Sequence, residues 1–313
     1  MLTSLKIKKL NATKSKWSNF KEVIHIDNHQ VKDYYLPMII FVLFTTASFL
    51  FFKIFAGQYI WHKMKIAGGN AFEFCEFNDL GNVLVQTSNT WSNLGFLVVG
   101  LLLIFFGIKD HRHQHEDDRA NLLLKYPFFS IIMGSSILYL FIGSFFYHAS
   151  VTSFFQMLDQ TGMYAIVFSF MAYHIFRAWP TLKTKNKGVV SSHKIIFIVF
   201  LILNVLFVSY LWKVVDVNVF FPILFVTYIT VTVIYNKRNS IVKASSKLLL
   251  FSLYMLFFSL TIWLLDREDV LCDPTSLIQG HALWHILNSV VLLMIYLHYR
   301  AERSFLPAEA NNS

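Results

Sequence analysis

Five polar side chains of this sequence stand at the ends of apolar segments, where a membrane-spanning protein rarely has them. Ser144 and His148 come at the end of one apolar segment, and Asp159 begins the next. His281 and His285 begin the last one. Ionisable groups at bilayer depth usually pair, line a wet cavity or hold a metal. If the three histidines and the carboxylate meet at one end of a helical bundle, they form a zinc site with a base beside it, which is typical of a hydrolase, and the location favours a lipid substrate.

The spacing of His281 and His285 suits a metal, because residues i and i+4 lie on one face of a helix. A catalytic zinc keeps three protein ligands and a water molecule. The ion lowers the pKa of that water to about 7, and a carboxylate such as Asp159 can take the proton. Taken singly, these residues have plainer interpretations. His148 could be an interfacial anchor, Asp159 a helix cap and Ser144 a small packing residue.

The composition is that of a membrane protein. Of 313 residues, 56% are hydrophobic and only 14% are charged, whereas soluble domains carry about 25% charged residues. Phenylalanine alone occurs 33 times. The net charge of +9 comes from basic residues in short segments between apolar runs. This distribution is the positive-inside pattern, and it argues against nucleic-acid binding.

Eight apolar segments are long enough, or nearly so, to cross a bilayer as helices of about 20 residues. We therefore expect an all-α membrane protein. The N-terminal tail and alternate loops are basic, whereas the loop 266–273 is acidic and the loop 149–156 has no charge. This asymmetry predicts cytoplasmic termini, with the histidines near the extracytoplasmic face. The segments are Pro37–Phe55, Trp91–Ile108, Tyr126–Tyr147, Leu158–Ala178, Ile195–Trp212, Val219–Tyr235, Leu248–Leu265 and Ala282–Tyr299.

The loop before the second span carries a further group of possible ligands. Glu73, Glu76 and Asp79 lie close together with amides between and after them, and such oxygens are the ligands that calcium uses. No EF-hand pattern is present, so a solvated acidic loop is the plainer interpretation. Cys75 in this loop and Cys272 in the acidic loop both fall on the predicted outer side, where oxidation is permitted. They predict one disulfide or, alternatively, two free thiols.

Five short strings together resemble the alkaline ceramidases, which are seven-span zinc amidases of the CREST group of membrane hydrolases. The order and nearly the spacing of the strings match from about Glu73 to Arg300. The resemblance implies a seven-helix ceramidase-like bundle, to which the N-terminal span is an addition. The strings are Cys-Glu-Phe-Asn at 75–78, Asn-Thr-Trp-Ser-Asn at 89–93, Gly-Ser-x-x-x-His at 143–148, Leu-Asp at 158–159 and His-Ala-Leu-Trp-His at 281–285.

The resemblance also implies a role for each of the unusual polar residues. His148, His281 and His285 match the family's zinc ligands. Asp159 matches the carboxylate that activates the metal-bound water, and Ser144 matches the serine that steadies the metal and the developing oxyanion. Together these residues imply a complete hydrolytic site.

A disulfide and a calcium site are implied in the same way. Cys75 and Cys272 match the family's disulfide. Gln86 stands where the family has an acidic calcium ligand, so we expect calcium to bind weakly or the site to be empty, since affinity depends on ligand charge. Glu73 replaces a frequent Asp, and Phe74 replaces a frequent Trp. The calcium ligands that the resemblance implies are Glu73, the Phe74 carbonyl, Glu76, Asn78 and Gln86.

The sequence therefore predicts a basic tail at 1–36, an extra transmembrane helix at 37–56, a hydrolase domain at 57–300 and a C-terminal tail at 301–313. The predicted function is zinc-dependent hydrolysis of ceramide-like N-acyl sphingolipids to a long-chain base and a fatty acid, with membrane lipids as partners. Two other classes stay open. One is a related hydrolase of ester lipids or phospholipids, and the other is a receptor or sensor with a structural metal. Hydrolysis is favoured because a structural site needs neither Asp159 nor Ser144.

Overall fold

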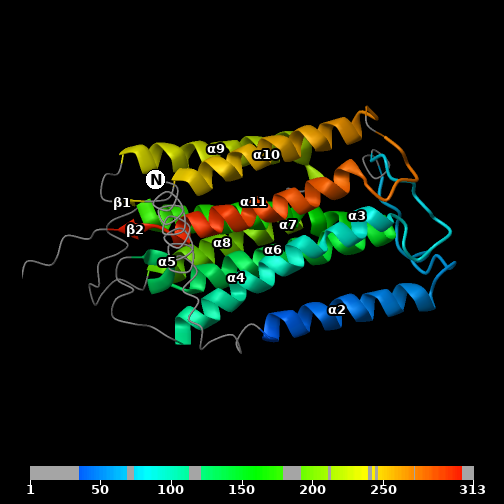
Figure 1. The fold of residues 1–313 in the computed structure, drawn as a ribbon, viewed down its shortest axis with the longest axis horizontal. Helices are drawn as coiled ribbons and strands as arrows, with labels where there is room; N and C mark the ends of the chain where they lie inside the picture. The colour runs from blue at the N-terminus through cyan, green and yellow to red at the C-terminus, as the bar shows by residue number, and fades with distance from the viewer. Residues whose placement is uncertain are drawn as a thin grey trace, which may run out of the picture.

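Long helices lie side by side along one axis of the computed structural model, with α2 on one outer side and α9 and α10 on the opposite side (Figure 1). The structure describes residues 35–68, 74–112, 121–178, 192–210, 213–238, 242–243, 246–270 and 272–304. The elements are α2 (Tyr35–Ile54), α3 (Thr87–Ser92), α4 (Leu94–Arg112), α5 (Leu122–Lys125), α6 (Phe128–Ser150), α7 (Ser153–Ala178), α8 (Ser192–Ser209), α9 (Val217–Arg238), β1 (Val242–Lys243), α10 (Ser246–Arg267), α11 (Gly280–Arg300) and β2 (Arg303–Ser304).

Six stretches among the described residues are long and apolar enough to cross a membrane. They are α2, the α3–α4 pair, α6, α9, α10 and α11. The other two predicted spans also form helices, α7 and α8, in the same bundle. The structure therefore confirms an all-helical membrane fold, while the count of seven spans plus one stays a prediction. Polar residues in the first turns of α7, Gln156, Asp159 and Gln160, lower its hydropathy.

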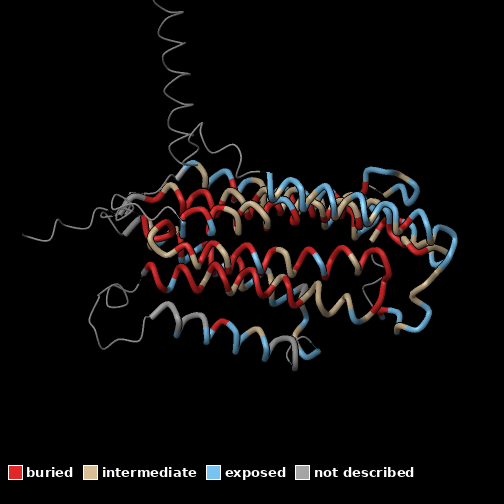
Figure 2. The backbone as a smooth tube through the Cα atoms, turned by 90° about the horizontal axis from the view of Figure 1, so that it is seen from below, coloured by how far each residue is buried: buried red, intermediate tan, exposed pale blue. Residues whose placement is uncertain are grey.

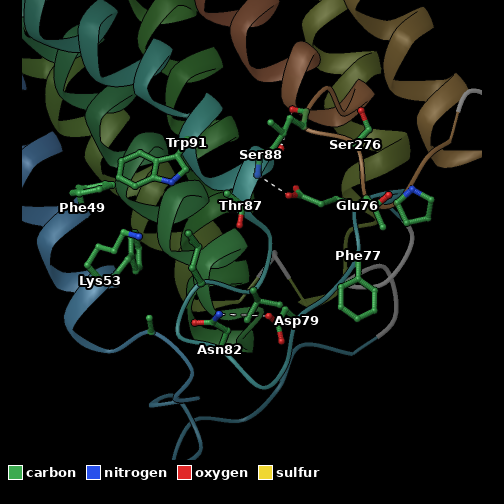
Figure 3. Close-up of a pocket in the computed structure, with 17 residues that line it drawn as sticks. Phe49, Lys53, Glu76, Phe77, Asp79, Asn82, Thr87, Ser88, Trp91 and Ser276 are labelled. Atoms are coloured by element: carbon green, nitrogen blue, oxygen red, sulfur yellow. Dashed lines mark hydrogen bonds between the residues drawn. The ribbon is translucent and has the colours of Figure 1, made fainter.

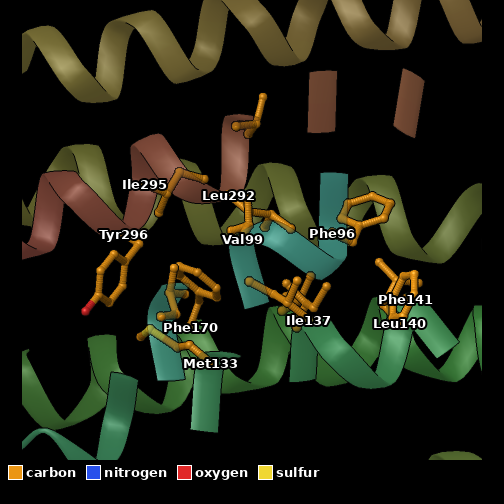
Figure 4. Close-up of a cluster of buried hydrophobic side chains, with 14 of the residues drawn as sticks. Phe96, Val99, Met133, Ile137, Leu140, Phe141, Phe170, Leu292, Ile295 and Tyr296 are labelled. Atoms are coloured by element: carbon orange, nitrogen blue, oxygen red, sulfur yellow. The ribbon is translucent and has the colours of Figure 1, made fainter. Parts of the chain in front are cut away.

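Helix α6 lies at the centre of the bundle. It packs against α4 and α7, while α11 packs against α10, α4 and α3. About 67% of the α6 span is buried but only 6% of the α2 span, and Figure 2 shows buried residues concentrated in the inner helices. The exposed apolar faces of the outer helices are suited to contact lipid. The residues of the inner core that Figure 4 labels are Phe96, Val99, Met133, Ile137, Leu140, Phe141, Phe170, Leu292, Ile295 and Tyr296.

The connection between α6 and α7 is much shorter than the sequence predicts. The absence of charge at 149–156 predicts a loop there, but only residues 151 and 152 lie between the two helices. Val151 turns the chain with φ 50°, a left-handed conformation that is rare for a β-branched residue, and its carbonyl accepts the N–H of Ala67 at 2.9 Å. Asp159 therefore lies inside α7 rather than at its N-terminus, which excludes the interpretation of Asp159 as a cap.

Two buried ion pairs hold the other end of the bundle. Arg300 at the end of α11 contacts Asp110 of α4 at 2.5 Å, and Arg177 of α7 contacts Glu302 at 2.7 Å. The Asn121 amide donates to the carbonyls of residues 299, 300 and 302, which fixes the chain after α11. Buried charges of this kind are stable only when they are paired. The pairs fix the ends of α4, α7 and α11, the helices that carry or contact the histidine site.

Candidate metal centre

Three buried histidines meet where α6 ends and α11 begins. His148 lies in the last turn of α6, whereas His281 and His285 lie in the first two turns of α11. The Nε2 atoms of His148 and His281 are 3.3 Å apart, and one ring nitrogen from each histidine lies within 4.8 Å of the others. Two nitrogens bound to a tetrahedral zinc at about 2.0–2.1 Å would be separated by about 3.3 Å. The cluster can therefore hold one metal ion.

Hydrogen bonds set two of these rings in the tautomer that a metal requires. The Nδ1 atom of His148 lies 2.5 Å from the Gln86 side-chain carbonyl, which can only accept, so Nδ1 donates and Nε2 keeps its lone pair. Ser92 donates to the Asn89 carbonyl and lies 2.8 Å from His285 Nδ1. Since its proton is used, the Ser92 oxygen accepts from His285; the Asn93 amide group lies farther from the same nitrogen, at 3.4 Å. Such second partners are usual for metal-binding histidines.

The remaining nitrogen of His285 points to the same conclusion. Its Nε2 atom is buried and has no hydrogen-bond partner in the described residues. A buried polar atom without a partner is costly unless a ligand takes its lone pair. Because one ring nitrogen from each histidine lies within 4.8 Å of the others and His285 Nε2 has no partner among the described residues, the donor set fits a cation that accepts nitrogen ligands.

His281 is held by aromatic rings rather than by a hydrogen bond. The Phe74 ring stacks on it with centroids 3.7 Å apart, and the Trp284 ring stacks at 5.2 Å. Asp266 at the end of α10 accepts the N–H of Cys75 through Oδ2, and its Oδ1 lies beside Gly280, the first residue of α11. This carboxylate therefore lies at the N-terminus of α11, where an anionic group is favourable.

Glycine makes the contact between α10 and α11 possible. A Cβ atom at Gly280 would lie 2.8 Å from the Asp266 Cβ and 2.9 Å from its Oδ1. Only a residue without a side chain lets Asp266 approach the first turn of α11 so closely. The position of His281 thus depends on the contact between Asp266 and Gly280, the residue that precedes it.

Asp159 of α7 lies opposite the segment of α6 that carries Ser144. Ser144 is buried and precedes His148 by one helical turn, so both point from the same face of α6. A Cβ at Gly143 would lie 2.5 Å from the Asp159 backbone nitrogen and 2.7 Å from the Leu158 carbonyl oxygen. Gly143 therefore lets α7 approach α6 closely at the point where Asp159 must lie.

The predicted calcium ligands make contacts within the chain. Glu73 lies outside the described residues. The Glu76 carboxylate accepts the N–H groups of Ser88 at 2.6 Å and Asn89 at 2.8 Å, and so caps α3. Burial raises the pKa of Glu76, although these two hydrogen bonds act in the opposite direction. The Asn78 Oδ1 accepts from the Gln86 amide at 2.8 Å. Calcium binding by this loop stays a prediction.

The disulfide between Cys75 and Cys272 is confirmed. It joins the loop before α3 to the loop before α11. Backbone and side-chain hydrogen bonds join the same two loops, from Phe77 N to the Pro274 carbonyl at 3.0 Å and from the Ser88 hydroxyl to the Leu277 carbonyl at 2.9 Å. The two segments that lead into α3 and α11 are therefore fixed to each other at the histidine end of the bundle.

Sequence reasoning misses the supporting residues of the site. Ser92 falls inside the string at 89–93, but nothing in the spacing places it against His285, which is 193 positions away. The family resemblance assigns Gln86 to calcium and gives no sign of its contact with His148. Asp266 falls in what reads as an acidic loop, whereas it lies in the last turn of a helix and is buried. A buried position for a carboxylate is not visible in a single sequence.

Comparison with known proteins gives one family. The family model for ceramidase matches residues 69–311. No curated protein matches the sequence. The matched range contains the three histidines, Asp159, Ser144 and the disulfide, and it leaves α2 outside. Because the match covers well over half of the chain and all of the histidine site, this membrane protein belongs to the ceramidase family.

Proposed function

We propose that this protein is a zinc-dependent integral-membrane amidase that hydrolyses ceramide-like N-acyl sphingolipids to a long-chain base and a free fatty acid. The observation that carries the proposal is the cluster of His148, His281 and His285, in which two rings are hydrogen-bonded through Nδ1 and leave Nε2 to a metal. The family supports the lipid amide as the substrate. Nitrogen ligands and a closed, buried site favour zinc.

Each residue near the cluster has a distinct part in the reaction. A zinc ion held by the three histidines would polarise the amide carbonyl and lower the pKa of a water molecule. Asp159 would take the proton of the attacking water and later give it to the leaving amine, as a general base and then a general acid. A hydrogen bond from Ser144, which lies on the facing segment of α6, would keep the Asp159 carboxyl in place for this transfer.

Ser144 has a second role, which must come after the first because its hydroxyl has a single proton. A hydroxyl has one O–H donor, so Ser144 cannot donate to Asp159 and to a substrate oxygen at once. When Asp159 has taken a proton, it is a poorer acceptor. The Ser144 hydroxyl would then turn to the oxygen on which negative charge develops, and such donors typically contribute about 10²–10³-fold to kcat.

The location of the site follows from charge and oxidation state. We propose that both termini are cytoplasmic and that the histidine end faces the opposite side, as the basic loops indicate. The Cys75–Cys272 disulfide at the histidine end supports this orientation, since disulfides persist in oxidising compartments. The substrate amide would then be bound near the outer membrane surface, with its chains among the helices.

The test compares substrates and a matched pair of variants. Purified protein would be incubated with a ceramide, with a phospholipid and with a lipid ester of the same acyl chain, with and without a chelator. We expect sphingoid base and fatty acid in equal amounts from ceramide, and loss of both with the chelator. Asp159→Asn should lose turnover but retain zinc, whereas Asp269→Asn, an exposed carboxylate at the same end, should behave as wild type.

Two results would contradict the proposal. Fatty acid released from the ester or phospholipid but not from ceramide would indicate a different lipid hydrolase. No turnover of any lipid by protein that contains its full metal complement would indicate a receptor or sensor. Analysis of the lipid products, together with measurement of the bound metal, distinguishes the two outcomes.

A further inference from the structure

A cleft of about 430 Å³ lies outside the histidine cluster, at the end of the bundle where α2 meets α3. Its walls come from the last turns of α2, the start of α3 and the two loops joined by the disulfide (Figure 3). The volume is in the range of small-molecule sites, which is roughly 300–1,000 Å³. Because α2 lies outside the residues that match the family, this cleft depends on a part of the chain that the family comparison does not cover.

The cleft carries charges of both signs on different walls. Lys53 extends from α2, and Glu76 and Asp79 lie across from it (Figure 3). Among the described residues Lys53 forms no ion pair with either carboxylate. Glu76 accepts two backbone N–H groups, and Asp79 accepts from Gly81 and Asn82. A ligand that carries a cation and an anion can pair with both walls at once.

Aromatic rings line the space around these charges. Phe49 and Trp91 lie on the side of Lys53, and Phe77 lies on the side of the carboxylates. Trp91 packs edge-on against Phe52, with ring centroids 5.8 Å apart, and this contact holds the Trp91 ring in place in the wall of the cleft. Aromatic faces attract quaternary and primary ammonium groups. The carboxylate side is therefore suited to an ammonium group, and Lys53 to a phosphate.

The depth of the cleft fits a lipid headgroup. Lys53 is in the last turn of α2, which is a candidate membrane span. Lysine at the end of a span reaches toward the headgroup level, and tryptophan is enriched there. Phe49 and Leu50, in the preceding turn, are about half exposed, at 52% and 53%. Acyl chains attached to a headgroup in the cleft could therefore follow the apolar surface of α2.

We propose that this cleft binds one zwitterionic phospholipid, with its phosphate on Lys53 and its ammonium group between Asp79, Glu76 and the aromatic rings. The lipid is a partner of the protein and not its substrate. The α3 helix separates the cleft from the histidines, since Thr87, Ser88 and Trp91 line the cleft while Ser92 contacts His285. The bound headgroup would hold α2 against α3.

The test measures lipid binding alone, so it does not depend on turnover. Delipidated full-length protein in detergent would be titrated with phosphatidylcholine and with phosphatidylglycerol of the same chains, and bound lipid counted by native mass spectrometry. We expect one phosphatidylcholine per chain. Phosphatidylglycerol, which has the phosphate but lacks the ammonium group, should bind at least about tenfold more weakly, as expected for the loss of a charge-assisted contact.

Two variants separate the two charges, and a third serves as control. Lys53→Met keeps the aliphatic part of the side chain and should weaken the binding of both lipids at least about tenfold. Asp79→Asn keeps an oxygen acceptor for the N–H of Gly81 and should weaken only the binding of phosphatidylcholine. Lys63→Met removes another exposed lysine of the same region that does not line the cleft and should bind as wild type. Equal binding of the two lipids to wild type would overturn the proposal, as would unchanged binding by Lys53→Met.

Discussion

Replacing Gln86 with alanine is expected to weaken zinc binding by the histidine cluster, although none of the three histidine ligands is changed. The Gln86 carbonyl is the acceptor for His148 Nδ1, and its amide group reaches Asn78 in the loop at 2.8 Å. In the alanine variant the His148 Nδ1–H group is buried without a partner. The ring is then free to rotate or to change tautomer, and either change removes Nε2 from the metal.

The size of the effect follows from the contacts that are lost. A buried donor left without an acceptor costs about 1–3 kcal/mol, which corresponds to roughly 5- to 150-fold in an equilibrium constant. Loss of second partners of metal-binding histidines typically costs about 10–100-fold in metal affinity or activity. The two estimates agree, so we expect Gln86→Ala to lower zinc affinity by about 10–100-fold.

Gln86→Glu provides the matched variant. A carboxylate can still accept from His148 Nδ1, and Asn78 can rotate its amide by 180° to donate to the other oxygen. We therefore expect zinc affinity to be retained or raised in Gln86→Glu. Asn82→Ala serves as control, because Asn82 is an amide of the same loop that contacts Asp79 and not the histidines.

Competition with a zinc-binding dye would measure the affinity of the four proteins, and circular dichroism would show whether each is folded. Equal zinc affinity in Gln86→Ala and wild type, with both folded, would refute the reasoning. It would mean that the His148 ring is fixed by packing and that its hydrogen bond contributes nothing to the metal site.

Three further predictions concern the neighbouring residues. Asp159→Asn should retain one zinc per chain but lose ceramide turnover by about 10²-fold or more, as expected for a positioned general base; normal turnover would place the proton elsewhere. Gly143→Ala should lower kcat and destabilise the protein by about 1–3 kcal/mol, because its methyl group would overlap the Asp159 backbone at 2.5 Å; unchanged kcat and thermal midpoint would show that α7 can shift without cost. Calcium should raise the activity of the wild type only at high concentration. Gln86→Glu should respond at a lower calcium concentration, since added ligand charge raises calcium affinity. Identical calcium responses of the two proteins would show that the loop is only a structural cap.

The chemical groups of the site can be predicted from the sequence because their types are unusual for their setting. Histidines at the ends of apolar segments, with His281 and His285 one helical turn apart, indicate a shared site from their residue types and spacing alone, whereas the role of Asp159 in that site stays a prediction. The apolar segments themselves predict the helices closely. The pairing of Cys75 with Cys272 requires the family resemblance, because two thiols in two loops that are both predicted to lie outside are compatible with a bridge or with free thiols.

The parts that could not be predicted depend on contacts between distant segments. The residues that orient the histidines, Gln86, Ser92 and Asp266, are ordinary polar residues whose role exists only when α3, α10 and α11 are packed together. The short α6–α7 connection is not predictable because an uncharged polar stretch is equally compatible with a loop or with the ends of two helices. The structure shows that α7 begins at Ser153 and that it passes close to α6 at Gly143.

The most direct test of the central claim is a titration of metal-free protein with zinc while ceramide turnover is followed. Protein stripped by a chelator should be inactive. Activity should then rise in proportion to added zinc and level off at one equivalent per chain, with sphingoid base and fatty acid formed in equal amounts. A His285→Ala protein should bind little zinc and stay inactive throughout. Full turnover by metal-free protein, or none by protein that holds one zinc at its three histidines, would contradict the assignment of this cluster as the centre that hydrolyses the lipid amide.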